Sequence, residues 1–456
     1  MKGLWIKTGL LILACVGVAQ AQLTMDFLGG GSRAQGMGKA FYAVSDDISA
    51  LTWNPAGLAK QEKPVLGFSY GLFRPRGSFD LLGQSGTAST LSSGTGNLNK
   101  ASYLGFLAPI RVRGHQFVLS AAYNRAFDEF QSSGVSLSGL YPNYYQNILI
   151  QNAQATLNVN SDYQASPYAF SLGFGTRLYH SWDFGAAVNV YTGKAVSHLS
   201  REIYAPEWLS VRLLGQTVQY DSVSRITDTV RFGGVNFTLA TKYTSPRFEF
   251  GLVLKSGYSL LEKENALTEN IVTVNGLVQG TSSDSIYNDN LLTKVQVPWV
   301  IGTGFAYKIR PNWLGSLDME YRPWSGKKIL VRDSIIILSG GDTREVFTTI
   351  DGKWFNAFTV RAGTEYMMQT KSRVFPTIPL RAGVGYVPLP APSYPTADTL
   401  NTQSVTMYTL SLGSGVYWQQ IHLDVAYTYS TYNFDNGLGE LKARNHDITM
   451  MFTGYF

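Results

Sequence analysis

Cysteine is almost missing from this chain of 456 residues, which contains only Cys15. This residue lies in an N-terminal segment that has the three parts of a secretory signal peptide. These parts are the basic residues Lys2 and Lys7, an apolar run over 10–18, and the cleavage site Ala19-Gln20-Ala21. We therefore predict a signal peptide over 1–21 and a mature chain that begins at Gln22, without disulfides or thiol chemistry. A lipoprotein signal at Cys15 is the alternative, but the apolar run continues past this residue.

Long apolar runs and charge are also scarce. No segment after the signal peptide approaches the roughly 18 uncharged apolar residues of a membrane-spanning helix. Charged residues make up 15% of the sequence, and the formal net charge is only +6. Without a basic cluster, the chain is not expected to bind nucleic acid.

Motifs for catalysis and cofactor binding are missing as well. The chain has five histidines, none of them at the spacing of a metal site, and it has no G-x-S-x-G nucleophile turn. Gly38-Lys39 is similar to the end of a phosphate loop, but Ala40 stands where Ser or Thr would be needed. We therefore predict no catalytic residues, no metal and no cofactor. His422 and Asp424 are interpreted as polar residues on one face of a strand.

Short segments with strand character, by contrast, fill most of the chain. Fourteen are predicted, over 64–74, 100–110, 115–127, 166–179, 183–194, 231–244, 247–259, 295–309, 312–324, 356–368, 378–387, 404–418, 420–432 and 445–456. Their connections alternate in length. The short ones are 111–114, 180–182, 245–246, 310–311, 369–377 and 419, and the long ones are 75–99, 128–165, 195–230, 260–294, 325–355, 388–403 and 433–444.

This alternation of tight turns and long loops, with an even number of strands, is typical of an outer-membrane β-barrel. Only helices and closed barrels satisfy every backbone hydrogen bond in lipid. We therefore predict an all-β fold, a 14-stranded antiparallel transmembrane β-barrel over 64–456. Its location would be the outer membrane of a Gram-negative-type bacterium, with the long connections as structureless loops outside.

Period-two alternation separates the two faces of these strands. Within 420–432, Ile421, Leu423 and Val425 alternate with polar residues. An Arg or Lys that faces lipid at the membrane midplane costs about 2–4 kcal/mol, so the charged faces must point into the lumen. The charges expected there are Asp318, Glu320, Arg322, Arg361, Glu365, Arg381 and Asp424.

The mixed signs of these lumen charges predict ion pairs, with one another or with charges of the segment before the barrel. The candidates in that segment are Arg33, Lys39, Asp46 and Asp47. We expect such pairs to hold a plug shut.

Aromatic residues near the strand ends predict where the membrane surfaces lie. The candidates for these girdles are Trp182, Trp299, Trp313, Trp324 and Trp418. In the last strand Ile448, Met450, Phe452 and Phe456 share one face, and the sequence ends at Phe456. A terminal aromatic residue of this kind resembles the signal that the barrel-assembly machinery recognises. We expect that machinery and the outer-membrane lipids as partners.

Residues 22–63 precede the first strand and do not alternate. They contain Gly36-Met37-Gly38 and, further on, Asn54-Pro55-Ala56-Gly57. Glycine lets a backbone turn sharply and pack closely, and Asn-Pro followed by Gly favours turns. About eight strands already make a barrel that side chains can fill, so a lumen of fourteen strands needs filling. We predict that 22–63 forms a hatch inside the barrel, with a loose periplasmic tail as the alternative.

The hatch resembles that of the FadL/TodX family of outer-membrane transporters for long-chain fatty acids and other hydrophobic compounds. The matching residues are Arg33, Met37-Gly38, Ala40, Ala43, Asp46-Asp47 and Asn54-Pro55-Ala56-Gly57-Leu58, and the strand count also matches. The resemblance implies a monomer that captures substrate outside and passes it by a rearrangement of the hatch. It also implies sideways release through an inward kink of the third strand. Here 115–127 contains no Gly or Pro, so the sequence does not show an opening.

The predicted function is passive transport of long-chain fatty acids or other hydrophobic small molecules, without enzymatic activity. The hatch also resembles that of PorV-type barrels, so a shuttle or scaffold for secreted proteins is the alternative. Apolar side chains of the hatch are candidates for the substrate site, because small-molecule sites are largely apolar. They are Phe27, Leu28, Met37, Phe41, Tyr42 and Trp53. Packing of the plug is the other role open to each of them.

Overall fold

The computed structural model describes residues 29–81, 89–93, 98–126, 129–145, 148–165, 167–211, 216–337, 343–393, 403–435 and 439–456. The predicted signal peptide and the candidates Phe27 and Leu28 lie outside these ranges. Three short helical segments come first: α2 (Ser32–Gly36), α3 (Ala50–Trp53) and the 3-10 helix η1 (Pro55–Lys60). Across the described ranges, no helix is long and apolar enough to cross a membrane.

Fourteen of the described strands form a closed antiparallel wall. They are β1 (Val65–Leu81), β3 (Leu98–Val112), β4 (His115–Arg125), β7 (Tyr168–Tyr179), β8 (Trp182–Val211), β9 (Gln216–Thr244), β10 (Phe248–Lys255), β13 (Val300–Arg310), β14 (Trp313–Arg322), β17 (Ala357–Gln369), β18 (Thr377–Ser393), β19 (Gln403–Tyr417), β20 (Ile421–Asp435) and β21 (Gly439–Tyr455). Each pairs with the next in this order, and β21 pairs with β1. The wall therefore has no open edge, and the predicted 14-stranded barrel is confirmed.

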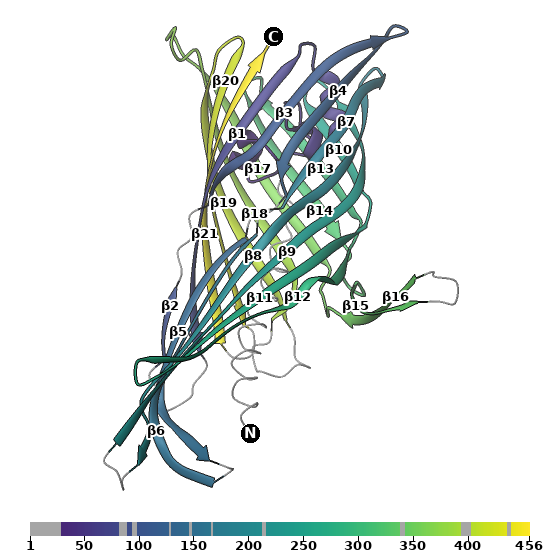
Figure 1. Ribbon diagram of the computed structural model, residues 1–456. Coiled ribbons are helices and arrows are strands. Elements are labelled where there is room, and N and C mark those ends of the chain that lie inside the picture. The colour runs from purple at the N-terminus through teal and green to yellow at the C-terminus, as the bar shows by residue number, and fades with distance from the viewer. Residues whose placement is uncertain are drawn as a thin grey trace.

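The other described strands extend the wall at one end. They are β2 (Ser89–Ser93), β5 (Glu129–Tyr145), β6 (Ile148–Ala165), β11 (Tyr258–Val274), β12 (Leu277–Val297), β15 (Lys328–Ile337) and β16 (Thr343–Asp351). With β8 and β9, which are 30 and 29 residues long, β5 and β6 form an arm that protrudes beyond the barrel (Figure 1). The prediction of structureless loops here is wrong. These strands have no lipid-facing side, so the period-two apolar signal is weak although backbone pairing continues.

Two predicted strands are each divided in the structure. The segment 247–259 is β10 up to Lys255 and β11 from Tyr258, and the segment 295–309 changes from β12 to β13 around Pro298. Proline lacks the N–H that a ladder needs, so it marks the end of a central strand. β9 consequently pairs with β10 near the short turns and with β11 further out.

The short connections lie at the opposite end, beside the C-terminus (Figure 1). They cover 113–114, 180–181, 245–247, 311–312, 370–376 and 418–420. Arg113 and Gly114 both have positive φ, at 50° and 84°. This conformation belongs to the tight two-residue hairpin turn whose twist matches that of the flanking strands. The predicted short turns are therefore confirmed.

The two faces of the wall divide as the alternation predicts. Leu423 and Val425 are 41% and 42% exposed, whereas Asp424 between them is 5% exposed. Trp182, Trp299 and Trp313 are also exposed, as an interfacial girdle requires. The assignment of Trp324 to a girdle is wrong. This side chain follows β14, turns into the lumen and packs edge-on against Trp354, with ring centroids 5.2 Å apart.

The hatch lies inside the barrel, nearer to the short turns (Figure 1). Glycines on the wall allow its backbone to touch the backbone of the strands. Gly363 on β17 faces Gly383 on β18, and a Cβ on either would lie within 2.3 Å of the Met37–Gly38 peptide. Glycines at 175, 185, 251 and 304 make similar approaches on other strands. A glycine within a strand often marks a close approach of this kind.

Candidate functional site

One strand of the wall, β14, binds three consecutive residues of the hatch. Asp318 accepts hydrogen bonds from the backbone N–H groups of Phe41 and Tyr42, at 2.6 and 2.7 Å. Glu320, the next inward residue, accepts one from the Tyr42 hydroxyl. Ser316, the inward residue on the other side, donates to a hatch carbonyl at 2.9 Å. The period of the strand thus matches the spacing of polar groups on the hatch.

A chain of charges joins α2 to three further strands. Arg33 donates through Nε and Nη2 to both carboxylate oxygens of Glu365, each at 2.8 Å, and through Nη1 to Asp46 at 2.5 Å. Glu365 also accepts from Arg381 at 2.7 Å, and Arg381 donates to Asp424 at 2.6 Å. Signs alternate along this chain, which is the arrangement that compensates buried charge. The bidentate contact between Arg33 and Glu365 also fixes the orientation of the guanidinium group.

The remaining predicted lumen charges gather around Glu320. Arg322 approaches this carboxylate at 2.6 Å and Arg361 at 3.6 Å. Sequence reasoning missed Lys242, a fully buried cation on β9 that donates to the hatch carbonyl of Ser45 at 2.8 Å. The alternation within 231–244 places this lysine on the inward face, so a signal for it was present.

The two neighbouring aspartates of the hatch have different surroundings. Burial raises the pKa of Asp46, but Arg33, together with Lys242 and Lys60, more than offsets this and holds the pKa well below its usual range. Burial raises the pKa of Asp47, whose nearest contact with Arg33 is 3.8 Å. Arg33 therefore favours the ionised form of Asp46.

The Asn-Pro-Ala-Gly element closes the hatch on itself. The Asn54 side chain donates to the carbonyl of Tyr42 at 2.8 Å and accepts from the N–H of Ala56 at 3.1 Å. A Cβ on Gly57 would lie 1.9 Å from the carbonyl oxygen of Ser45, so only glycine fits there. This motif therefore joins the two halves of the hatch.

The apolar hatch candidates are buried where the hatch meets the wall. Met37 and Phe41 are 0% exposed, Tyr42 is 2% exposed and Trp53 is 5% exposed. Trp53 packs edge-on against both Phe41 and Tyr42, with ring centroids 6.2 and 6.3 Å apart. In this state their contacts are those of packing.

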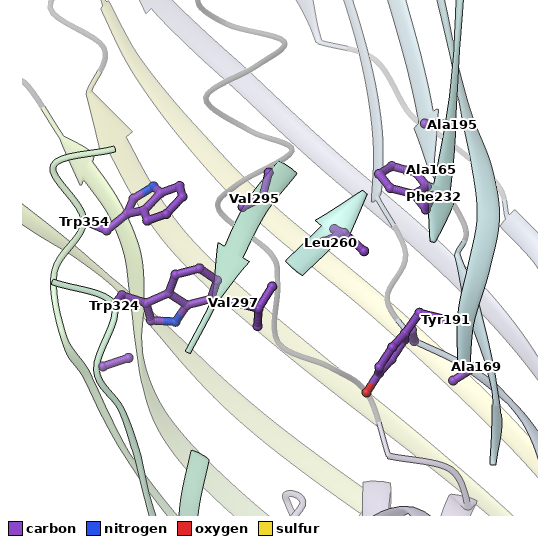
Figure 2. Close-up of a cluster of buried hydrophobic side chains, with 12 residues drawn as sticks. Ala165, Ala169, Tyr191, Ala195, Phe232, Leu260, Val295, Val297, Trp324 and Trp354 are labelled. Atoms are coloured by element: carbon purple, nitrogen blue, oxygen red, sulfur yellow. The ribbon is translucent and has the colours of Figure 1, made fainter. Parts of the chain in front are cut away.

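A second apolar group lines the lumen on the outer side of the hatch. This outer lumen cluster consists of Ala126, Ala165, Ala169, Tyr191, Ala195, Phe232, Leu260, Val295, Val297, Trp324, Trp354 and Ala357. Figure 2 shows Trp324 and Trp354 on one side and Tyr191 and Phe232 on the other. Tyr191 stacks on Tyr258 with ring centroids 5.0 Å apart. Sequence reasoning missed the cluster. Eight of its twelve residues lie in segments predicted as strands, but the segments that bring them together include Ala165, Ala195, Leu260 and Trp354, which were predicted as loops.

A small polar pocket lies where the outer lumen cluster meets the hatch. Its lining is Gly29, Thr52, Asn124, Ala126, Ala169, Ser171, Asn189, Tyr191 and Lys255. The Lys255 ammonium lies 3.4 Å from the carbonyl of Thr52, and Ser171 donates to Asn189 at 2.6 Å. Apolar wall and polar groups therefore adjoin here. Within the described ranges, His, Cys, Asp and Glu side chains form no group of three or more that could bind a metal.

The third strand of the wall is fully paired. β4 pairs with β3 from His115 to Asn124 and with β7 from Phe117 to Arg125, without a shift of register. In this state the wall has no gap at the place where the family resemblance implies one.

These features define a class of protein: an outer-membrane transport barrel that is closed by an N-terminal hatch. The chain matches the model of the family described as outer membrane protein transport protein (OMPP1/FadL/TodX) over residues 18–440. The chain therefore belongs to this family of transport channels. The predicted family, the outer-membrane location and the absence of enzymatic activity are confirmed.

Solved structures support the fold. A FadL homologue of Pseudomonas aeruginosa is 12% identical with a TM-score of 0.56, over 95% of this chain and 99% of that one. The CymD monoaromatic hydrocarbon channel is 14% identical with a TM-score of 0.54, and its coverage is the same, 95% and 99%. The toluene transporter TodX of Pseudomonas putida is 13% identical with a TM-score of 0.53, again over 95% and 99%. No curated protein sequence matches the chain.

Proposed function

We propose that this chain conducts hydrophobic small molecules from outside the cell to the hatch, with long-chain fatty acids as the first candidates. The observation that carries the proposal is the contact between the outer lumen cluster and the polar pocket at Lys255. A fatty acid has an apolar tail and an anionic head, so it matches both parts at once. Sites for small molecules usually combine an apolar lining with a few polar groups.

The apolar side chains of the hatch belong to a later step of this proposal. Met37, Phe41, Tyr42 and Trp53 are buried against the wall, so a substrate meets them only after the hatch moves. We propose that a substrate contacts these four side chains during passage. Phe27 and Leu28, which lie outside the described residues, stay candidates for the same role from the sequence alone.

Release sideways through the third strand has a physical cost in this chain. Opening β4 from β7 would leave backbone groups unpaired in lipid, at several kcal/mol each. We therefore propose that substrate leaves along the margin of the hatch toward the short turns. The pocket at Lys255 lies on this margin.

The experiment compares binding of a labelled long-chain fatty acid and of toluene by the refolded barrel and by Lys255→Gln. We expect Lys255→Gln to weaken fatty-acid binding about tenfold, because a hydrogen bond to a charged group contributes about 1.5–3 kcal/mol. Toluene binding should not change, because toluene has no charged group. The matched control is Lys308→Gln, a half-buried lysine that lies near Glu249 at the other end of the wall.

Three outcomes separate the alternatives. Equal loss of both ligands in Lys255→Gln would indicate a general effect on the lumen and would contradict the head-group assignment. Binding of toluene alone would identify monoaromatic compounds as the substrates, which are the cargo in the descriptions of CymD and TodX. Absence of binding by a correctly folded barrel would favour the alternative function, a shuttle or scaffold for secreted proteins.

A further inference from the structure

We propose that the short-turn end of the barrel binds anionic phospholipids of the periplasmic leaflet through a ring of basic side chains. This basic rim consists of exposed residues in or beside the short turns and at the start of β1. They are Lys63, Arg111, Arg113, Arg177, Arg247, Arg310, Lys371 and Arg373. The inference is independent of which substrate the lumen carries.

Acidic side chains near the turns do not cancel this charge. Asp183 and Glu249 are buried, at 1% and 8% exposure, and Glu62 is exposed. Arg177 pairs with Asp183 at 2.9 Å. For the other seven members of the basic rim, the described ranges of the chain contain no acidic partner. The rim therefore keeps most of its positive charge for a partner outside the protein.

The depth of the basic rim coincides with the edge of the apolar outer surface. Along the chain the two kinds of residue alternate or adjoin, as in Ile110-Arg111-Val112-Arg113 and in Arg373-Val374-Phe375. Val112 and Val374 are 48% and 60% exposed. Long basic side chains lay their stems on such apolar surface and hold the charge at its boundary. At the edge of a lipid-facing band, that boundary is the layer of phosphate head groups.

The distribution of basic residues between the two ends of the barrel favours binding to the periplasmic leaflet. Short turns of outer-membrane barrels lie on the periplasmic side, which places the rim beside the inner leaflet. The outer extension does not repeat the pattern, since β11 alternates Glu262, Lys263 and Glu264. Basic clusters beside a membrane recognise anionic lipids, and the attraction falls off within a Debye length of about 8 Å.

The test uses quenching of tryptophan fluorescence by brominated lipids. Trp182 and Trp313 are 42% and 38% exposed beside the short turns, whereas Trp299 is 45% exposed at the other end of the wall. All proteins in the test therefore carry Trp299→Phe, so that the exposed tryptophans Trp182 and Trp313 report on lipids next to the basic rim. The mature chain is reconstituted in phosphatidylcholine vesicles that contain brominated phosphatidylglycerol or brominated phosphatidylcholine. We expect phosphatidylglycerol to bind about fivefold more tightly at low salt, and the ratio to approach one at high salt.

A rim variant tests whether these residues cause the preference. It combines Arg111→Gln, Arg113→Gln, Arg247→Gln, Arg310→Gln and Arg373→Gln, and its expected binding ratio is close to one. Replacement of the same five residues by Lys should retain the preference, because only the charge is needed. The matched control neutralises five basic residues of the outer extension, namely Lys194, Arg201, Arg225, Lys263 and Lys328, and should behave as the wild type.

Folding is checked by circular dichroism and by heat-dependent gel mobility. If the rim variant with five substitutions does not fold, the double variant Arg111→Gln/Arg113→Gln is used instead. Its substitutions are confined to one surface turn, and it should still lose part of the preference for phosphatidylglycerol. Equal binding of the two lipids by the wild type at low salt would overturn the proposal. An unchanged ratio in a folded rim variant would overturn it as well.

Discussion

Arg33 is the residue through which the hatch and the wall are most directly joined. It contacts Glu365, a residue 332 positions further along the chain, and also Asp46 within the hatch. Glu365 in turn contacts Arg381. A single substitution of Arg33 therefore removes one ion pair between the hatch and the wall and one ion pair within the hatch. This residue is the one we choose to test how the hatch is held.

Arg33→Gln is expected to loosen the hatch without unfolding the barrel. Removing one partner of a buried ion pair costs about 3–5 kcal/mol, and a value near the lower limit is expected because the Arg33 side chain is 12% exposed. The measurement is single-channel recording in planar bilayers. Channel openings should become more frequent, and the conductance of each opening should increase. Lys60→Gln is the control, since Glu249 keeps Lys242 at 2.9 Å.

Acidification provides a second readout of the same contact. The pKa of Asp46 is lowered in the folded protein, so its contribution to hatch stability is complete above the ordinary aspartate pKa of about 4 and declines as pH falls below it. The loss of this contact should therefore increase the conductance of the wild type as pH falls below about 4. Identical traces for wild type and Arg33→Gln at neutral pH would contradict the role given to Arg33.

Glycines on the wall explain how a hatch of ordinary peptide fits so closely. Gly363→Ala should displace the hatch, because the new Cβ would lie 2.3 Å from the carbonyl oxygen of Met37. Overpacking costs about 1–3 kcal/mol, so amide hydrogen exchange in the hatch should accelerate about tenfold. Gly315→Ala is the control, because its nearest neighbouring atom is 3.8 Å away. Equal exchange in the two variants would show that the hatch tolerates a wall side chain.

At the scale of elements, β4 and β7 decide whether the wall has a side exit. Ala121 and Leu172 are directly opposed on these strands and both point outward, away from the lumen. Opposed residues of antiparallel strands lie about 4.5–5.5 Å apart at Cα, within the range of a disulfide. The predicted mature chain lacks cysteine, so an introduced pair would have no competing thiol.

The double variant Ala121→Cys/Leu172→Cys should transport substrate equally well when oxidised and when reduced. The reason is that the proposed route follows the hatch margin and leaves this seam closed. Uptake of labelled substrate is measured before and after reduction, with Leu412→Cys/Tyr427→Cys as a matched outward pair in the β19–β20 seam. Uptake that is blocked by the β4–β7 disulfide alone, and restored by reduction, would show that the third strand opens.

The two ends of the molecule differ in structure and chemistry. The outer end carries paired extension strands and the outer lumen cluster, while the hatch, the short turns and the basic rim lie toward the other end (Figure 1). A hydrophobic molecule that enters from outside therefore meets apolar side chains first and the charged hatch contacts second. Monomeric assembly and recognition of Phe456 by the assembly machinery remain predictions.

Local patterning by itself determined the barrel, its faces and the presence of a hatch. Lipid outside and polar groups inside impose a period of two on every wall strand, and this period is visible without knowing which strands meet. The Asn-Pro-Ala-Gly element is mainly local. Asn54 donates to the carbonyl of Tyr42 and accepts from the N–H of Ala56, at most 12 positions away, and only its further bond to the carbonyl of Thr241, at 3.3 Å, reaches the wall.

Only the tertiary structure decided which groups meet across the lumen. Closure of the barrel brings Arg33 to Glu365 and turns Trp324 inward, and no local pattern encodes either contact. The extension strands escaped prediction because strands outside lipid lose the alternation that lipid imposes. The unbroken pairing of β4 was not predicted either, because continuous pairing depends on the neighbouring strands β3 and β7 as well as on β4 itself.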